Sequence, residues 1–397
     1  MSYLVQLVLI LLLTKLGAHL SNVLNFPSVI GELLVGVIAG PAVLHILVGT
    51  TFIQYFSEIG VIVLMFIAGL EGDLHLLMKF WKPALTVAVL GVIFPTITAA
   101  SLCALVFGFK WTTAIFIGLI LSATSVSISV QVLKEMGRLN TKEGAIILGA
   151  AVADDIICVI LLGICVAFFG SGASSNQPVW LMISTKLLFF VAMLVLGRWF
   201  VPPFMSFFSK LNTSENIATG AVILCFGFAA IAVALGMSDV LGAYFAGIAL
   251  SETKFKETLT EKIEPIGYSI FIPVFFVSIG LNITFKGLQN DLVFIISLIV
   301  IAIIGKQIGG ALGAKMFQLN WNESNVVGAG MISRGEMALV VANVALGAKL
   351  IDQNHYTAMI LVTVVTTIIA PLILKFFIQR QTAPKKIRSD SINEVKV

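Results

Sequence analysis

GAIILGAAVADDIICVILLGICVAFF, from Gly144 to Phe169, is the stretch that decides the fold of this chain. Its 26 residues are apolar except for two adjacent aspartates, Asp154 and Asp155. About 20 apolar residues in a helix cross the hydrocarbon core of a bilayer, so the stretch predicts a transmembrane helix. One ionised carboxylate at its centre costs at least roughly 2.5–3.5 kcal/mol. Two neighbouring carboxylates also repel each other, so we expect at least one to hold a proton or a cation near neutral pH.

The composition assigns the whole chain to the membrane. Of 397 residues, 59% are hydrophobic and only 11% are charged, against about 25% charged in soluble domains. The first apolar stretch begins at Tyr3 without a basic leader or a small-residue cleavage site, which predicts a spanning helix rather than a removed signal peptide. The four cysteines lie in apolar runs, so no disulfide framework is expected. The sequence predicts an all-α polytopic membrane protein.

Apolar runs separated by charged residues, Gly, Pro and Asn predict about thirteen transmembrane helices. They span approximately 3–20, 27–48, 56–72, 83–108, 111–136, 143–169, 178–208, 214–236, 238–252, 264–285, 290–317, 322–347 and 355–380. With loops assigned to alternate sides, one side holds 3 of the 24 Lys and Arg residues and the other holds 18. The positive-inside rule then predicts an external N-terminus and a cytoplasmic C-terminus.

The chain also repeats itself. VIGELLVGVIA from Val29 aligns with VLGAYFAGIAL from Val240, an offset of 211 residues. The same offset, without a gap, gives these pairs: Gly31 with Gly242, Gly36 with Gly247, Gly69 with Gly280, and Ser122 with Ser333. The aligned crossings are the second and the ninth, an odd difference, so the two copies are predicted to have opposite orientations. Inverted repeats are typical of secondary transporters, whose sites lie near the midplane.

Lys306 lies near the middle of the eleventh crossing, with no acidic residue nearby in the sequence. This position is too central for the side chain to reach the membrane surface, so we expect it to pair with a midplane carboxylate. The pair is either an architectural ion pair or a titrating switch, because a desolvated lysine can lose its proton. Asp154 and Asp155 project about 100° apart on a helix, so they cannot share one partner.

The fifth and twelfth crossings are expected to be discontinuous. The fifth contains LSATSVSIS (121–129), and the twelfth contains GMISRGEMAL (330–339), with charged residues around a glycine. Paired breaks of this kind place half-helix ends, with partial charges of about ±0.5, near the midplane. Thr124 and Ser125 would then offer oxygens to a cation. The expected helix-break and dipole-compensating residues are Ser127, Arg334, Gly335 and Glu336. Arg334 and Glu336 either neutralise the exposed dipoles and each other or take part directly.

Some motifs are missing from the sequence. It contains no Walker A loop, and its four histidines lie near the ends of crossings without metal-ligand spacing. We therefore expect no cofactor and no nucleic-acid partner.

Four motifs in the same order resemble those of the monovalent cation:proton antiporters of the second family, most closely the bacterial NapA-type Na+/H+ antiporters. They are FPSVIGELLVGVIAGP (26–41), AVADDI (151–156), GKQIGG (305–310) and GMISRGEMALV (330–340). The resemblance covers essentially the whole chain. It implies a NhaA/NapA-like fold in the bacterial cell membrane, in a homodimer whose core parts move as elevators.

The resemblance also divides residues 1–380 into parts. The core would be about 83–169 and 290–380, and the dimerisation part about 1–82 and 178–285, followed by a short cytoplasmic tail, 381–397. In that family the second aspartate carries the ion and the proton, which implies Asp155 here. Asp154 would form a salt bridge with Lys306, and Thr124 and Ser125 would lie near the ion. Two aspartates imply electrogenic exchange of cytoplasmic Na+, and also Li+, for external H+.

Three alternatives stay open. A K+/H+ or mixed Na+/K+:H+ exchanger is the nearest, because no residue in the sequence distinguishes the two alkali ions. An intramembrane aspartyl protease needs aspartates on two facing helices, which one adjacent pair does not provide. A passive channel fits an inverted repeat with midplane ionisable pairs less well than alternating access does. No enzymatic activity is therefore expected.

Overall fold

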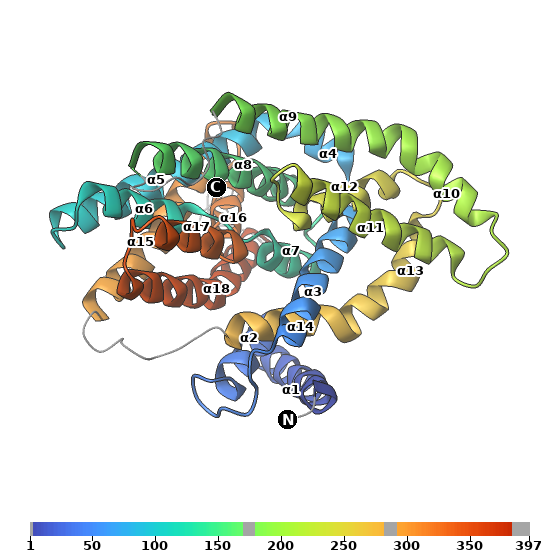
Figure 1. Ribbon diagram of the computed structural model, residues 1–397, viewed down its shortest axis with the longest axis horizontal. Coiled ribbons are helices and arrows are strands. Elements are labelled where there is room, and N and C mark those ends of the chain that lie inside the picture. The colour runs from blue at the N-terminus through green and yellow to red at the C-terminus, as the bar shows by residue number, and fades with distance from the viewer. Residues whose placement is uncertain (1–2, 170–178, 282–291, 383–397) are drawn as a thin grey trace, which may run out of the picture.

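The computed structural model describes residues 3–169, 179–281 and 292–382, where the chain is helical and forms no strand (Figure 1). In chain order the elements are α1 (Tyr3–Val23), α2 (Ser28–Ala39), α3 (Thr51–Glu71), α4 (Leu74–Lys79), α5 (Trp81–Leu105), α6 (Trp111–Ser122), α7 (Val126–Glu135), α8 (Lys142–Phe169), α9 (Val179–Val195), the π-helical turn η1 (Leu196–Phe200), α10 (Val201–Ser209), α11 (Asn216–Ala234), α12 (Asp239–Ser251), α13 (Lys256–Ile266), the π-helical turn η2 (Gly267–Phe271), α14 (Ile272–Leu281), α15 (Leu292–Lys315), α16 (Trp321–Gly330), α17 (Glu336–Gly347) and α18 (Gln353–Thr382).

Every predicted crossing corresponds to a helix or to consecutive helices of the described ranges. In the part of the chain that the structure describes, ten helical stretches are long and apolar enough to span a membrane. The others are the short helices α2 and α12 and the interrupted pair α16 and α17. The tenth crossing was expected to begin at 264, but the helix begins at Lys256. Residues 256–263 are too polar to register as an apolar run, yet Lys, Glu and Leu are good helix formers.

The helices form two groups. In Figure 1, α5 and α6 lie beside α15–α18 on one side of the molecule, and α10–α13 lie on the other. Within the first group α5 packs against α6, α8 and α15. Within the second, α3 packs against α12, and α2 packs against α1 and α14. Segments distant in the sequence therefore share each group. The predicted tail, 381–397, lies outside the described residues apart from the end of α18.

Two glycine contacts hold helices of the second group close together, one between α2 and α14 and one between α3 and α12. A Cβ atom on Gly36 of α2 would collide with the Val277 carbonyl of α14, and a Cβ on Gly280 would collide with α2. Gly69 of α3 and Gly247 of α12 meet in the same way. The 211-residue offset converts the first contact into the second, because it maps Gly36 onto Gly247 and Gly69 onto Gly280. The backbones approach this closely because none of these residues carries a side chain.

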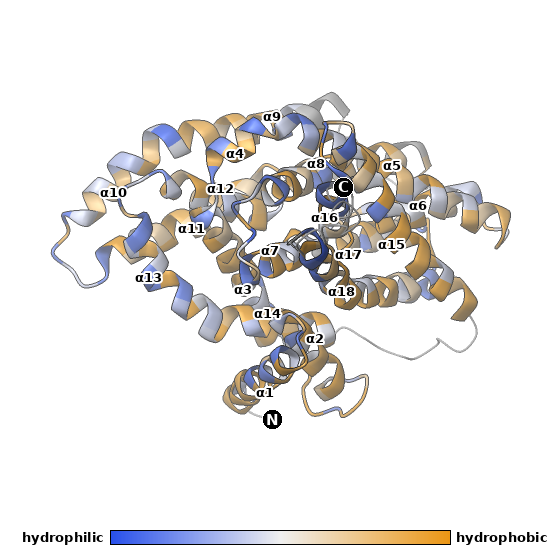
Figure 2. Ribbon diagram, turned by 180° about the vertical axis from the view of Figure 1, so that it is seen from behind, coloured by the Kyte–Doolittle hydropathy of each residue, from blue (hydrophilic) through white to orange (hydrophobic). Residues whose placement is uncertain are grey.

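The outward faces are apolar. Figure 2 shows hydrophobic residues along the outer helices of the molecule. Exposed large side chains include Leu12, Leu16 and Leu20 of α1, Val191 and Leu194 of α9, and Val293, Ile296 and Val300 of α15. Such continuous apolar surface is expected of a membrane-embedded bundle. The four cysteines are free and lie in helices, in agreement with the prediction that no disulfide framework is present.

Candidate functional site

The two predicted helix breaks lie against each other. Helix α6 ends at Ser122 and α7 begins at Val126, whereas α16 ends at Gly330 and α17 begins at Glu336. Between them the Ser125 N–H donates to the Ser333 carbonyl over 2.8 Å, and the Ser333 hydroxyl donates to the Ser125 carbonyl over 2.8 Å. The amide and carbonyl of Ser125 and the carbonyl of Ser333, which the breaks free, are thus hydrogen-bonded across the crossing, as buried backbone groups require.

Local sequence accounts for this approach. Gly335 lies next to Ser125, and a Cβ atom on Gly335 would come within 2.7 Å of the Ser125 hydroxyl oxygen. A side chain at this position would therefore push the two extended segments apart. The Ser129 hydroxyl adds a further link, because it donates to the Gly330 carbonyl at 2.5 Å and contacts the Ser333 hydroxyl at 3.1 Å.

Among the described residues, Arg334 binds backbone carbonyls of three elements around the two breaks. Its guanidinium is fully buried and donates two hydrogen bonds, of 2.9 and 2.7 Å, to the Leu121 carbonyl in the last turn of α6. Further bonds of 2.7 Å reach the carbonyls of Ala302 and Ile332. The C-terminal end of a helix carries partial negative charge, so a cation at this position stabilises the half-helix. The hydroxyl of Thr367 donates to the backbone carbonyl of Arg334 itself.

Asp154 is the centre of the second set of contacts. Its side chain is fully buried. The Lys306 ammonium forms an ion pair with Oδ1 at 2.9 Å, and the Thr124 N–H donates to Oδ2 at 2.9 Å. Lys306 is also fully buried, and its ammonium lies 3.6 Å from the Cβ position that a larger residue would occupy at Gly91 of α5. One carboxylate therefore joins α8, α15 and the α6–α7 break.

Asp155 differs from its neighbour in exposure. Asp154 has none of its surface exposed, whereas Asp155 is only partly buried. The next helical position projects about 100° away, so the two carboxylates face different surroundings. Asp154 is held by a lysine and a backbone amide inside the bundle, whereas the side chain of Asp155 is partly exposed.

Three hydroxyl oxygens at the α6–α7 break are buried and lack a hydrogen-bond partner among the described residues. They belong to Thr124, Ser125 and Ser127. Buried polar atoms are nearly always hydrogen-bonded, so such a cluster of exceptions needs an explanation. Hard cations take oxygen ligands, and hydroxyls also bind water. The break is therefore suited chemically to a small hydrated or partly dehydrated cation.

The structure brings most of the predicted site residues to this crossing. Asp154, Lys306 and Thr124 are in direct contact, and Ser125 and Gly335 adjoin one another. The side chain of Glu336 lies outside the described residues, so its predicted pairing with Arg334 cannot be placed. The sequence interpretation missed Ser333 and Thr367 as contacts. Ser333 was detectable as the repeat partner of Ser122, but nothing in the sequence marked Thr367.

In the described ranges, no group of three or more His, Cys, Asp and Glu side chains is arranged to hold a metal ion.

In this helical bundle, two interrupted helices cross beside a buried carboxylate–lysine pair. This is the architecture of a secondary transporter. The profile of the family described as "Sodium/hydrogen exchanger, transmembrane" matches residues 8–380. The chain belongs to this family.

The chain is 44% identical over 390 residues to the Na(+)/H(+) antiporter of Enterococcus hirae, covering 96% of this chain and 99% of the relative. It is also 44% identical to the Na(+)/H(+)-K(+) antiporter GerN of Bacillus cereus, covering 94% and 95%. The sodium proton antiporter MjNhaP1 of Methanocaldococcus jannaschii shares the fold, with a TM-score of 0.72 at 18% identity over 94% of this chain and 96% of that structure.

Proposed function

We propose that this protein exchanges cytoplasmic Na+ for external H+ across a bacterial cell membrane, with Asp155 as the carrier carboxylate. The observation that carries this proposal is the contrast between the adjacent aspartates. Asp154 is fully buried, is paired with Lys306 and accepts a hydrogen bond from the Thr124 amide, whereas Asp155 is only partly buried. The names of the two relatives support Na+ and H+ as the exchanged ions.

Coupling follows from competition. A carboxylate binds either a cation or a proton, so the two ions cross in opposite directions and never together. With Na+ bound at Asp155, the hydroxyl oxygens of Thr124 and Ser125 supply further ligands, and the Asp154–Lys306 pair keeps the buried site near neutrality. Protonation of Asp155 releases Na+ and neutralises the carrier for the return step.

The exchange is proposed to be electrogenic. If the Asp154–Lys306 pair also exchanges a proton during the cycle, two protons cross for each Na+. One net charge then moves inward, worth roughly 2.3 kcal/mol per 100 mV. The inside-negative potential of the membrane therefore helps to expel Na+.

The helix groups suggest how the site changes sides. The parts proposed as core, 83–169 and 290–380, include both interrupted helices and Lys306. The parts 1–82 and 178–285 would form the dimer contact of a homodimer and stay fixed while the core slides as an elevator. The segregation of Lys and Arg supports an external N-terminus and a cytoplasmic C-terminus.

Potassium is the second candidate cation, and Li+ a further one. The printed name of GerN includes K+, and its 44% identity makes K+ transport a specific alternative. Oxygen ligands alone do not separate alkali ions, because the size and rigidity of the site decide that selectivity. Membership of an exchanger family favours transport over an aspartyl protease.

The test is proton flux in proteoliposomes with an imposed pH gradient, with Na+, Li+ or K+ added in turn. We expect dissipation of the gradient by Na+ and Li+ with the wild type and none with Asp155→Asn. Asp352→Asn, which changes an aspartate outside the site, is the matched control and should leave the flux unchanged. Cation-driven flux that persists in Asp155→Asn contradicts the proposal, and an equal response to K+ moves the protein to the K+-transporting alternative.

A further inference from the structure

One face of α7 is polar along its whole length. Ser127, Gln131 and Glu135 follow one another at spacings of four residues, which places them on a single face of α7. Thr124, in the break just before the helix, precedes Ser127 by three residues. This polar face begins at the break that binds Asp154 and ends at the last residue of α7. Mid-membrane polar side chains tend to line ion paths.

The end of this polar face that is nearest the break has unused hydrogen-bonding capacity. The hydroxyl oxygens of Thr124 and Ser127 are buried and have no partner among the described residues. Ser129, two residues further along, lies off the polar face, and its hydroxyl is fully used by Gly330 and Ser333. Ser125 of the break has a third such oxygen, so the unpartnered hydroxyls gather at the break and at the end of the polar face that adjoins it.

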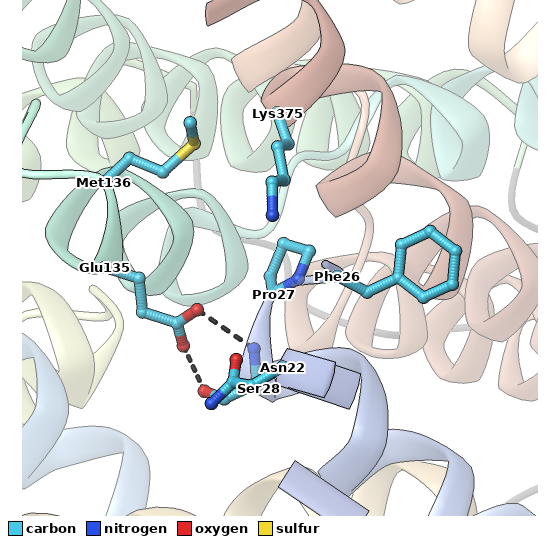
Figure 3. Close-up of a pocket in the computed structure, with 7 residues that line it drawn as sticks. All are labelled: Asn22, Phe26, Pro27, Ser28, Glu135, Met136 and Lys375. Carbon is cyan, nitrogen blue, oxygen red and sulfur yellow. Dashed lines mark hydrogen bonds between the residues drawn. The ribbon is translucent and has the colours of Figure 1, made fainter. Parts of the chain in front are cut away.

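The opposite end of the polar face, at Gln131 and Glu135, is covered by a chain of hydrogen bonds to other helices. The Tyr268 hydroxyl donates to Gln131 Oε1 over 3.1 Å, and Gln131 Nε2 donates to Glu135 Oε1 over 2.8 Å. The Ser28 N–H donates to Glu135 Oε2 over 3.0 Å, and the Ser28 hydroxyl also donates to this carboxylate. Figure 3 shows the last link, at the wall of an open pocket of about 310 Å³ lined in part by Lys375.

This chain joins α7 to helices of the other group. Ser28 begins α2, and Tyr268 lies in η2, between α13 and α14. Lys134, next to Glu135, forms ion pairs with Glu71 of α3 at 2.9 Å and Glu264 of α13 at 2.7 Å. Its ammonium also lies 4.6 Å from the ring centre of Tyr268, within the range of a cation–π contact.

We propose that the polar face of α7 is the cytoplasmic route by which cations and protons reach the aspartate pair, and that the Tyr268–Gln131–Glu135–Ser28 hydrogen-bond chain is its gate. This inference rests on the proposed antiport and on the proposed orientation, which places the end of α7 in the cytoplasm. In the conformation described here the gate is shut. Movement of α7 away from α2 and η2 breaks the chain and connects the pocket to the unpaired hydroxyls of Ser127 and Thr124.

The gate has a structural basis in η2. A π-helical turn is often found at functional sites. This one, Gly267–Phe271, contains Tyr268, whose side chain contacts α7. Lys15 of α1 donates to the Tyr268 carbonyl over 3.1 Å. The backbone of Tyr268 is thus held by the second group, while its hydroxyl donates to Gln131 and its ring faces the Lys134 ammonium, both on α7. Removal of that hydroxyl therefore weakens the gate and leaves the scaffold in place.

The test measures the accessibility of single cysteines and not transport. In full-length protein with the four native cysteines replaced by alanine, Ser127→Cys and Ser129→Cys are labelled with a membrane-impermeant thiosulfonate. The reagent is applied to inverted and to right-side-out vesicles. We expect Ser127→Cys to react from the cytoplasmic face, and to react about fivefold faster when Tyr268→Phe is added, the factor given by one hydrogen bond of about 1 kcal/mol. Ser129→Cys is the matched control and should not accelerate.

Gln131→Met, which breaks the same chain with a side chain of similar shape, gives a second measurement if Tyr268→Phe does not fold. Monodisperse elution in detergent identifies the folded variants. Labelling of Ser127→Cys only from the external face, or at a rate unchanged by either variant, overturns the proposal. Equal acceleration of Ser129→Cys does the same, because it indicates general loosening. The labelling pattern does not depend on which ion is transported. A negative labelling result therefore contradicts the gate without contradicting the proposed antiport, which the proton-flux experiment tests.

Discussion

Ser125 and Ser333 hydrogen-bond to each other in both directions at the point where the two interrupted helices cross. The Ser125 amide donates to the Ser333 carbonyl, and the Ser333 hydroxyl donates to the Ser125 carbonyl. The two breaks are therefore linked directly by hydrogen bonds. Because Thr124 of the same break binds Asp154, the position of the aspartate pair depends on this crossing.

The Asp154–Lys306 pair gives a stability prediction. Breaking a buried ion pair by removing one partner costs about 3–5 kcal/mol, because the other charge is left uncompensated. We expect Lys306→Met to lower the melting temperature of the purified protein clearly. The double variant Asp154→Asn/Lys306→Met should recover most of this loss. Thermal unfolding followed by intrinsic fluorescence measures both. A double variant no more stable than Lys306→Met would show that the pair is not the source of the loss.

Arg334 gives a second prediction. Its guanidinium satisfies three carbonyls in the described structure, through four hydrogen bonds, and a lysine ammonium cannot reproduce this planar geometry. Hydrogen bonds that involve a charged group contribute about 1.5–3 kcal/mol each, so Arg334→Lys should destabilise the protein by at least one such bond. Arg138→Lys, at a half-exposed arginine, is the control. Equal melting temperatures for the two variants contradict the role of Arg334 in capping α6.

The glycine contacts give a third prediction. Gly36→Ala and Gly247→Ala each place a methyl group against the backbone of a facing helix, and overpacking of this kind costs about 1–3 kcal/mol. The two variants should lose similar stability, because the repeat makes their contacts equivalent. Gly227→Ala is the control, since a Cβ there meets no atom within 4 Å and alanine favours the helix. Thermal unfolding in detergent measures all three, and a loss confined to one of the first two variants contradicts the equivalence.

The competition mechanism gives a fourth prediction, on pH. Protonation of the carrier carboxylate excludes Na+, so the apparent KM for Na+ should rise as the pH falls. In the limit of one competing proton the rise is about tenfold per pH unit. Initial rates of Na+-driven proton flux at several pH values give this dependence. An apparent KM that is independent of pH while the maximal rate falls would indicate separate cation and proton sites.

The sequence predicted the helical fold, the two breaks and the internal repeat, because each depends on patterns within the chain. Apolar length marked the crossings, and Gly335 with its charged neighbours marked the second break. Contacts between distant segments were harder to predict. The partners of Arg334 are carbonyls, which every residue carries, and Ser28 and Glu135 are separated by 107 residues. Such contacts depend on how helices pack, and a single sequence records that only indirectly.

The two glycine contacts, Gly36 with Gly280 and Gly69 with Gly247, have a consequence for biosynthesis. Helix α2 meets its partner α14 only after a further 244 residues have been made. At about 5–20 residues per second, the interval is roughly 12–50 s. During this interval, the glycine face of α2 that later meets α14 lies against lipid or against the insertion machinery. The scaffold of this protein is therefore completed late in translation. A ribosome that stops just before α14 has already made α3 and α12, but it leaves α2 without its partner.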